Sequence, residues 1–304
     1  MKNIMFAGPA ILALLLASSC KKENLNNAGK SKTDPSATKI LRFSAIPDEN
    51  TTEQTVKFKK FADYLSKKLG VETQFIPTTD YASAVNKFIL GEIHLTWFGG
   101  LTGVQARNEV KGARAIAQGI EDPNYISYFI ANADTGLEMS DSFPEKIKDM
   151  KFTFGSEQST SGRLMPSFFI EKETGTAPEK WFSIPVGFSG AHDKTAKLVE
   201  SGAFQVGALS YKKYDSMVES GKLDKEKCKI IWKTPPYADY NWTAHPELDQ
   251  IHGEGFIDKI QAALIDISDE QLLKALTRSK IISAKNEDFQ GIEDIAKKLR
   301  FLNN

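Results

Sequence analysis

The sequence predicts a two-lobed α/β fold in which each lobe is a mainly parallel sheet flanked by helices and two hinge crossings join the lobes. From residue 40 onward, short apolar runs alternate with segments of helical periodicity. This rhythm implies right-handed crossovers between parallel strands. A polar break at 132–136 interrupts the alternation, which then restarts, and a second break at 234–236 contains prolines. The chain is therefore expected to pass twice between the lobes.

The elements of the first lobe follow from local patterns. ILRFSAI (40–46) is typical of a strand, and apolar residues at helical spacing in 55–70 end at Gly70, a helix stop. Asp80 is a plausible N-cap for the next helix. Strands are also expected at 71–76, 93–98, 112–118 and 125–132, and helices at 80–91 and 100–109.

The second lobe repeats the alternation, and a helical tail closes the chain. Ligand sites in such sheets lie beyond the carboxyl ends of strands. Strands are expected at 151–156, 181–188, 203–210 and 228–233, and helices at 143–150, 161–173, 192–202 and 211–221. The predicted domains are 39–132 plus 236–304 for the first lobe and 133–235 for the second.

The first residues are expected to lie outside the fold. Residues 1–20 carry a lysine, a short apolar core and then small residues, the proportions of an export signal. Cys20 after Ala-Ser-Ser resembles the lipobox of bacterial lipoproteins, although leucine stands four positions before it rather than three. The alternative is an ordinary signal peptide that ends nearby. Residues 21–38 are polar and predict a flexible tether. Cys228 then has no partner and is expected to be a buried thiol.

Composition excludes some functions. The 304 residues include 39 acidic and 39 basic side chains, so no basic stripe for nucleic acid is expected. No Walker-type phosphate loop is present. The histidines at 94, 192, 245 and 252 lack metal-ligand spacing, so neither a metal nor a cofactor is expected.

One junction between a strand and a helix is rich in hydroxyl groups. GSEQSTSGRLMPSFF (155–169) places Ser159, Thr160, Ser161 and Gly162 at the start of the expected helix. An N-cap needs only one hydroxyl. Unpaired N–H groups and the helix dipole favour an anion there, hydroxyls add donors, and glycine permits close approach. The sequence therefore predicts either a generous cap or a seat for a tetrahedral oxyanion.

An enzyme is a rival interpretation, with Ser159, His192 and Asp239 as a conceivable hydrolase triad. The segment is not a G-x-S-x-G elbow, however, and no base adjoins the hydroxyls in sequence. We therefore predict a binding protein and not an enzyme.

Four motifs follow one another along the chain: TDYASAV, LTWFGGLTGVQA, STSG and GAHDKTAKLVESG. Together they resemble the phosphonate-binding family of periplasmic receptors for ABC importers, and the likeness runs from about 40 to 249. SAIPDENTTEQ and GARAIAQGIEDP are similar to a branch of the family that is assigned to selenate. The resemblance implies a type II periplasmic binding protein fold, a small oxyanion (phosphonate, phosphite, phosphate or selenate) as ligand, and permease and ATPase partners. It also implies a monomer that meets the membrane only through its lipid anchor.

The resemblance also implies ligand contacts, each with a simpler alternative. Tyr81 matches a ligand-binding tyrosine but could cap the sheet edge, and His192 matches a ligand histidine but could be a helix-end residue. Ser159, Thr160, Ser161 and Gly162 match the hydroxyl cluster, and Asp239 matches an acidic contact but could stabilise its loop. Phe98 replaces a ligand tyrosine of aminoalkylphosphonate receptors but could be core. The carboxylate that would bind a substrate amine is missing near Gln205 or Val206, which disfavours such ligands.

Two further functions stay open. The same fold could serve a membrane kinase as a sensor, or bind a sulfonate or a pyrimidine. The orientation of Asp239 separates two ligand classes, because a phosphorus oxyanion near neutral pH can retain a proton for a carboxylate, whereas selenate has none to give.

Overall fold

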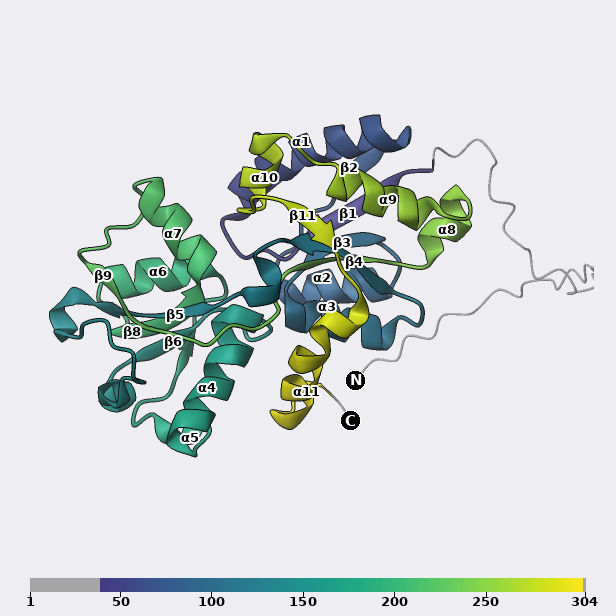
Figure 1. Ribbon diagram of the computed structural model, residues 1–304. Helices are drawn as coiled ribbons and strands as arrows, with labels where there is room; N and C mark the ends of the chain where they lie inside the picture. The colour runs from purple at the N-terminus through teal and green to yellow at the C-terminus, as the bar shows by residue number, and fades with distance from the viewer. Residues whose placement is uncertain (1–38, 303–304) are drawn as a thin grey trace, which may run out of the picture. The chain divides into compact units, whose positions relative to one another are not determined.

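The computed structural model describes residues 39–302, which form two mixed sheets with helices on both faces (Figure 1). The predictions for Cys20 and for residues 1–38 lie outside these residues. The first lobe consists of the first sheet and the helices packed on it, and the second lobe is defined in the same way. No helix within 39–302 is both long enough and apolar enough to cross a membrane.

The first sheet has six strands in the order β11-β4-β10-β3-β1-β2. β1 pairs in parallel with β2 and β3, whereas β10 runs antiparallel between β3 and β4. The strands are β1 (Leu41–Ala45), β2 (Thr73–Phe75), β3 (Leu95–Phe98), β4 (Arg114–Gly119), β10 (Asn241–Ala244) and β11 (Ile281–Ser283).

Helices cover both faces of the first sheet. Figure 1 shows α1 and α9 over one face and α2, α3 and α11 over the other, in agreement with the packing of α1 on α9 and of α3 on α2 and α11. The helices are α1 (Thr51–Leu69), α2 (Tyr81–Ile89), α3 (Gly100–Glu109), α8 (Glu247–His252), α9 (Phe256–Ile265), α10 (Glu270–Ala275) and α11 (Gln290–Lys298).

Local chemistry explains the ends of these helices. The Asn50 side chain accepts hydrogen bonds from two N–H groups in the first turn of α1, which ends at Gly70 with a φ of 68°. Only glycine adopts this left-handed conformation without strain. Asp80 caps α2 by accepting from the Ser83 N–H at 2.7 Å, as predicted.

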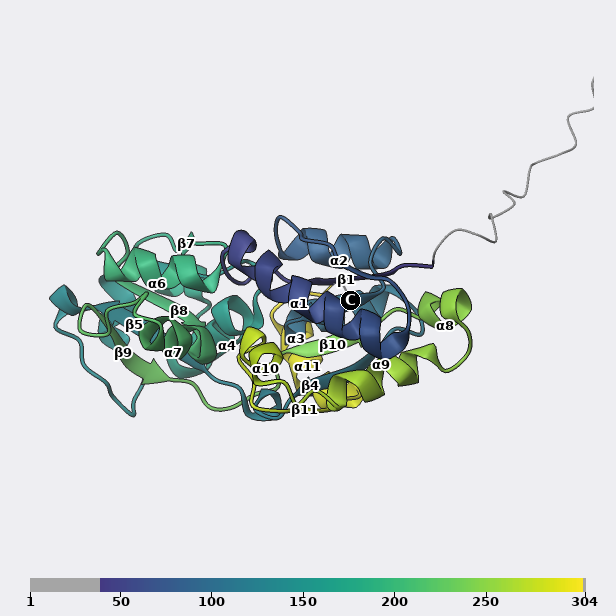
Figure 2. The same cartoon turned by 90° about the horizontal axis from the view of Figure 1, so that it is seen from above.

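The second sheet has the order β7-β6-β8-β5-β9, with β5 antiparallel to both neighbours. Figure 2 shows α6 and α7, which pack on each other, over this sheet. The strands are β5 (Ser127–Asn132), β6 (Phe152–Phe154), β7 (Gly187–Phe188), β8 (Val206–Ser210) and β9 (Cys228–Lys233). The helices are α4 (Met165–Thr174), α5 (Pro178–Trp181), α6 (His192–Glu200) and α7 (Tyr211–Glu219).

The predicted domain boundary at 132/133 requires a correction. β5 belongs to the second sheet, so the first crossing precedes it, close to Tyr125. The polar residues after β5 form a 3₁₀ turn, Ala133–Thr135, inside the second lobe. Their polarity reflects a solvent-exposed turn and not an interlobe linker. The second crossing follows β9 as expected, and Tyr125 and Tyr237 pair across the two crossings through N–H···O bonds of 2.8 and 2.9 Å.

Two short elements also differ from prediction. The helix expected at 143–150 is a 3₁₀ turn, Glu145–Asp149. The strand expected at 181–188 is reduced to β7, because α5 takes its first residue and Pro185 offers no N–H for a strand ladder.

Candidate functional site

Two strand-to-helix junctions, one from each lobe, meet at the candidate site. In the first lobe, β3 ends at Phe98, and Gly99 leads into α3. In the second lobe, β6 ends at Phe154, and the hydroxyl-rich segment leads through a π-helical turn, Thr160–Leu164, into α4. Both junctions lie at the carboxyl ends of strands, where helix N-termini present N–H groups.

The hydroxyls of the second junction have different roles. Ser159 is the N-cap, and its Oγ accepts from the Gly162 N–H at 2.9 Å. Thr160 reaches the other lobe, where its Oγ1 accepts from the Leu101 N–H at 2.9 Å. Ser161 Oγ lies 3.4 Å from Nε2 of His192. The cap hypothesis therefore holds for one hydroxyl, while the next two face the other lobe and a histidine.

Glycines allow these groups to converge. A Cβ on Gly99 would lie 3.0 Å from Thr160 Oγ1 and 3.4 Å from Asp239 Oδ1, so both lobes and the second crossing meet there. A Cβ on Gly162 would lie 3.1 Å from Cε1 of His192. Gly162 thus permits close packing of the His192 ring, whereas the sequence suggested close approach of a ligand.

Asp239 is fully buried in the second crossing. Its Oδ1 accepts from the Gly100 N–H at 2.8 Å, while its Oδ2 has no hydrogen-bond partner among residues 39–302. Burial raises the pKa of Asp239 to about 7, although the Gly100 N–H and the hydroxyls of Thr160 and Ser161 oppose the rise. A buried carboxylate oxygen without a hydrogen-bond partner is costly, so Oδ2 is the candidate acceptor of this site.

Tyr81 is the second buried group with an unused polar atom. It is the first residue of α2, and its hydroxyl has no partner within the described part of the chain. Burial and the nearby Asp48 raise the pKa of Tyr81 well above its ordinary value, while the Ser159 hydroxyl opposes this. The phenol is therefore a proton donor that is free to bind an anion.

His192 is a neutral group in this site. Burial lowers its pKa to about 4. Its Nδ1 accepts from the Ser210 N–H at 3.4 Å, which leaves the ring proton on Nε2, the atom facing Ser161. No carboxylate accepts from Nδ1, because a backbone N–H occupies that side. The imidazole is therefore a donor rather than a base, which contradicts the triad alternative.

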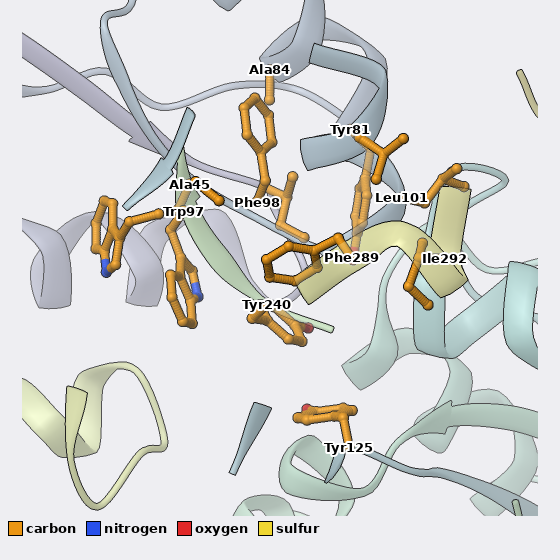
Figure 3. Close-up of a cluster of buried hydrophobic side chains, with 14 of the residues drawn as sticks. Ala45, Tyr81, Ala84, Trp97, Phe98, Leu101, Tyr125, Tyr240, Phe289 and Ile292 are labelled. Atoms are coloured by element: carbon orange, nitrogen blue, oxygen red, sulfur yellow. The ribbon is translucent and has the colours of Figure 1, made fainter. Parts of the chain in front are cut away.

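Two predicted positions require correction. Phe98 belongs to the hydrophobic core (Figure 3). Its ring packs edge-on against Phe88 of α2, with the ring centroids 5.6 Å apart. Gln205 precedes β8 and its Oε1 accepts from the Lys151 N–H, so it lies at the end of β8 away from His192. The β8 residue beside His192 is Ser210, which is also uncharged.

The positive charges near the junctions are already paired. The Arg163 guanidinium lies over the Phe154 ring at 4.2 Å and forms an ion pair with Glu179, while its buried Nη1 has no hydrogen-bond partner among residues 39–302. Arg278 pairs with the fully buried Asp122 at 2.6 Å. The donors already placed at the two junctions are uncharged hydroxyls, backbone N–H groups and the His192 ring. Within residues 39–302, no cluster of three or more His, Cys, Asp or Glu side chains could hold a metal ion.

Several participating groups were not predicted from the sequence. The first N–H groups of α3, at Gly100 and Leu101, bond to Asp239 and Thr160. Gly99 and Gly100, between a strand and a helix, were the sequence signal that could have predicted these N–H contacts. Ser127 donates from Oγ to the Ser161 carbonyl at 2.7 Å and so fixes the hydroxyl segment from β5, a contact with no sequence signature.

The comparisons with known proteins identify the family of the chain. Residues 43–289 match the family model described as the periplasmic substrate-binding protein of phosphonate ABC transporters. The chain belongs to this family. It is therefore the periplasmic substrate-binding component of an ABC importer rather than an enzyme, and permease and ATPase subunits are its implied partners.

Individual relatives cover most of the chain. A probable ABC transporter phosphite-binding protein, PhnD1 of Prochlorococcus marinus strain MIT 9301, is 36% identical over 268 residues, or 86% of this chain and 90% of the relative. Its structure in complex with methylphosphonate covers 87% of this chain and 100% of its own, with a TM-score of 0.83. The phosphate-import protein PhnD of Mycolicibacterium smegmatis is 28% identical, over 84% of this chain and 79% of the relative. These likenesses confirm the predicted type II fold.

Proposed function

We propose that the chain binds a small phosphorus oxyanion that retains one proton, such as phosphite or methylphosphonate, between its lobes. The single observation that carries this proposal is Asp239 Oδ2, a buried acceptor without a partner in residues 39–302, in a site otherwise built from donors. A monoprotonated oxyanion supplies the missing proton. Selenate and sulfate supply none at neutral pH, and the carboxylate would repel them.

Uncharged donors would hold the remaining oxygens. Tyr81 offers its hydroxyl, Ser161 its hydroxyl, and His192 its Nε2–H. Thr160 contributes by joining the hydroxyl segment to α3 of the other lobe. Each charge-assisted bond contributes about 1.5–3 kcal/mol, so three or four of them contribute about 5–12 kcal/mol before the cost of association, which limits the affinity from these bonds to about micromolar.

An organic amine on the phosphorus is disfavoured. Ser210 stands beside His192 where a carboxylate would be needed, and Lys213 already neutralises the nearby carboxylates of Asp48 and Glu49. The names of the two PhnD relatives, phosphite-binding and phosphate-import, support an inorganic or small alkyl ligand.

The lobes would separate at the crossings near Tyr125 and Tyr237 and close on the ligand before delivery to the permease. We further propose that Cys20 carries a lipid anchor and that the protein acts as a monomer. Mass spectrometry of the mature protein would detect the diacylglyceryl group, and an unmodified Cys20 would contradict anchoring.

Isothermal titration of the purified protein with phosphite, methylphosphonate, phosphate, selenate and sulfate tests the ligand class. We expect one of the three phosphorus oxyanions to bind more tightly than selenate and sulfate, with the larger margin at pH 8, where Asp239 is mostly ionised and repels an anion that carries no proton. Tighter binding of selenate would support membership of the selenate branch of the family. A preference for sulfonates would contradict binding of a tetrahedral oxyanion by the hydroxyl segment at 159–161.

A further inference from the structure

The candidate site is sealed in this structure. Tyr81, Ser161 and Asp239 are exposed by 2%, 1% and 0%, respectively. An anion can reach these groups only if the lobes separate, so every contact that spans the lobes must break when ligand enters or leaves. The free energy of those contacts therefore enters the binding free energy even where they never touch the ligand.

The ion pairs between the lobes, as far as residues 39–302 show them, come from lysines of α7 and the turn after it. Lys212 pairs with Glu121 at 3.1 Å, Lys213 with Glu49 at 2.7 Å, and Lys222 with Glu53 at 2.6 Å. The acidic partners Glu49 and Glu53 lie at the start of α1 or just before it. One edge of the second lobe is thus complementary in charge to one edge of the first.

The pair between Lys213 and Glu49 differs from the others in burial. Both of its side chains are 10% exposed, compared with 51% and 47% for Lys222 and Glu53. Nζ of Lys213 also lies 4.0 Å from Oδ1 of Asp48. Exposed pairs contribute little, whereas removal of one partner from a buried pair leaves an uncompensated charge.

Asp48 connects this ion pair to the candidate site. Its main-chain oxygen accepts from the His192 N–H at 3.1 Å, across the lobes. Its Oδ2 accepts from the Tyr240 hydroxyl at 2.8 Å, next to Asp239 in the second crossing. Asp48 therefore contacts one candidate ligand residue directly and the sequence neighbour of another.

We propose that Lys213 is a positioning residue for anion binding, because it holds Asp48 and Glu49 only when the lobes are closed and so sets the population of the closed form. It touches no ligand. It acts on affinity by lowering the free energy of the conformation in which His192, Thr160 and Asp239 lie together. The proposal rests on the proposed function only in its choice of methylphosphonate as the probe.

The first test is Lys213→Met, which keeps most of the apolar stem and removes the charge. The carboxylates of Asp48 and Glu49 would retain only Lys57, at 2.8 Å from Glu49, when the lobes close. We expect the Kd for methylphosphonate to rise about tenfold or more, mainly through faster dissociation, because the apparent Kd is divided by the closed fraction. Titration calorimetry measures the Kd, and stopped-flow displacement measures the dissociation rate.

The matched control is Lys222→Met. It also removes an ion pair between the two lobes, but an exposed one, and we expect a change in Kd of less than about twofold. Glu49→Gln is the second variant, in case Lys213→Met fails to fold. It removes the other partner, and it should shift Kd in the same direction while thermal unfolding remains a single transition.

Small-angle scattering of the ligand-free proteins gives a readout that does not depend on the identity of the ligand. We expect a larger radius of gyration for Lys213→Met than for Lys222→Met. Equal Kd values for these two variants, or tighter binding by Lys213→Met, would overturn the proposal. If the wild type binds phosphite or phosphate but not methylphosphonate, the anion that binds replaces methylphosphonate as the probe. If it binds none of the three, the proposed function fails and the scattering comparison decides alone, with equal radii counting against the role of Lys213.

Discussion

The substitution Asp239→Asn isolates the proton contact on which the ligand assignment depends. Asparagine keeps the shape of the side chain, and its Oδ1 can still accept from the Gly100 N–H, now 2.8 Å from Asp239 Oδ1. Its NH₂ group, a donor, replaces the acceptor Oδ2. Loss of one charge-assisted bond to the ligand proton costs about 1.5–3 kcal/mol, or about ten- to 150-fold in the Kd for methylphosphonate. Affinity for selenate should rise, because repulsion becomes attraction.

The same substitution has a second consequence, for stability. Burial raises the pKa of Asp239 from 3.8 to about 7. The folded state therefore binds this proton more tightly than the unfolded state, so the contribution of Asp239 to stability is full below pH 4 and is lost as pH rises through 7. The difference between the two pKa values corresponds to at most roughly 4 kcal/mol. Asp239→Asn should match the ligand-free wild type near pH 4 and exceed it in stability at pH 8.

Titration calorimetry with methylphosphonate and selenate, and denaturant unfolding at pH 4 and pH 8, measure these effects on the same two proteins. The reasoning is refuted if Asp239→Asn leaves the ratio of the two affinities unchanged. It is also refuted if the stability difference between variant and wild type is the same at both pH values. Other buried groups titrate in both proteins, and the comparison cancels them.

Three other variants test separate contacts. Ser161→Ala should weaken oxyanion binding by roughly 1–3 kcal/mol with the fold intact, and unchanged affinity by calorimetry would argue against a ligand role. Thr160→Val leaves the buried Leu101 N–H without its acceptor in the closed form and should speed ligand dissociation several-fold by stopped flow, since an unmet buried donor costs about 1–3 kcal/mol. An unaltered rate would contradict this. Arg278→Met removes the partner of the buried Asp122 and should lower the free energy of unfolding by about 3–5 kcal/mol in urea, so a loss below about 1 kcal/mol would show that the pair is not a structural requirement.

The alternation of strands and helices predicted most of the fold because it depends on local periodicity. The strand at 228–233 and the helix ends at Asp80 and Gly70 were predicted to the residue. The boundary at 132/133 was not, because the sequence of β5 contains no information about which sheet it joins. A crossing strand pairs with neighbours that are distant in sequence, and local patterns do not specify such pairing.

The parts of the candidate site that depend on local sequence patterns were predictable, and the parts that depend on packing were not. The hydroxyl segment and Tyr81 stand at helix starts, which the sequence marks. Phe98 was assigned to the ligand by analogy, but the alternation of strand side chains places its ring against Phe88. Three-dimensional packing gives the three adjacent hydroxyls three different partners. Ser159 caps the helix, Thr160 bonds to the other lobe, and Ser161 lies beside His192.

The placement of β5 and β10 affects the order in which the chain can fold after synthesis or export. All strands of the second sheet lie between residues 127 and 233, so this sheet is complete once β9 has emerged. The first sheet must wait for β10, which enters between β3 and β4 and is made more than 120 residues after β4 begins. Until then β3 and β4 expose unpaired edges. The segment from β1 to β4 is therefore the part of the fold most in need of a holding chaperone, even though it is made before the second sheet.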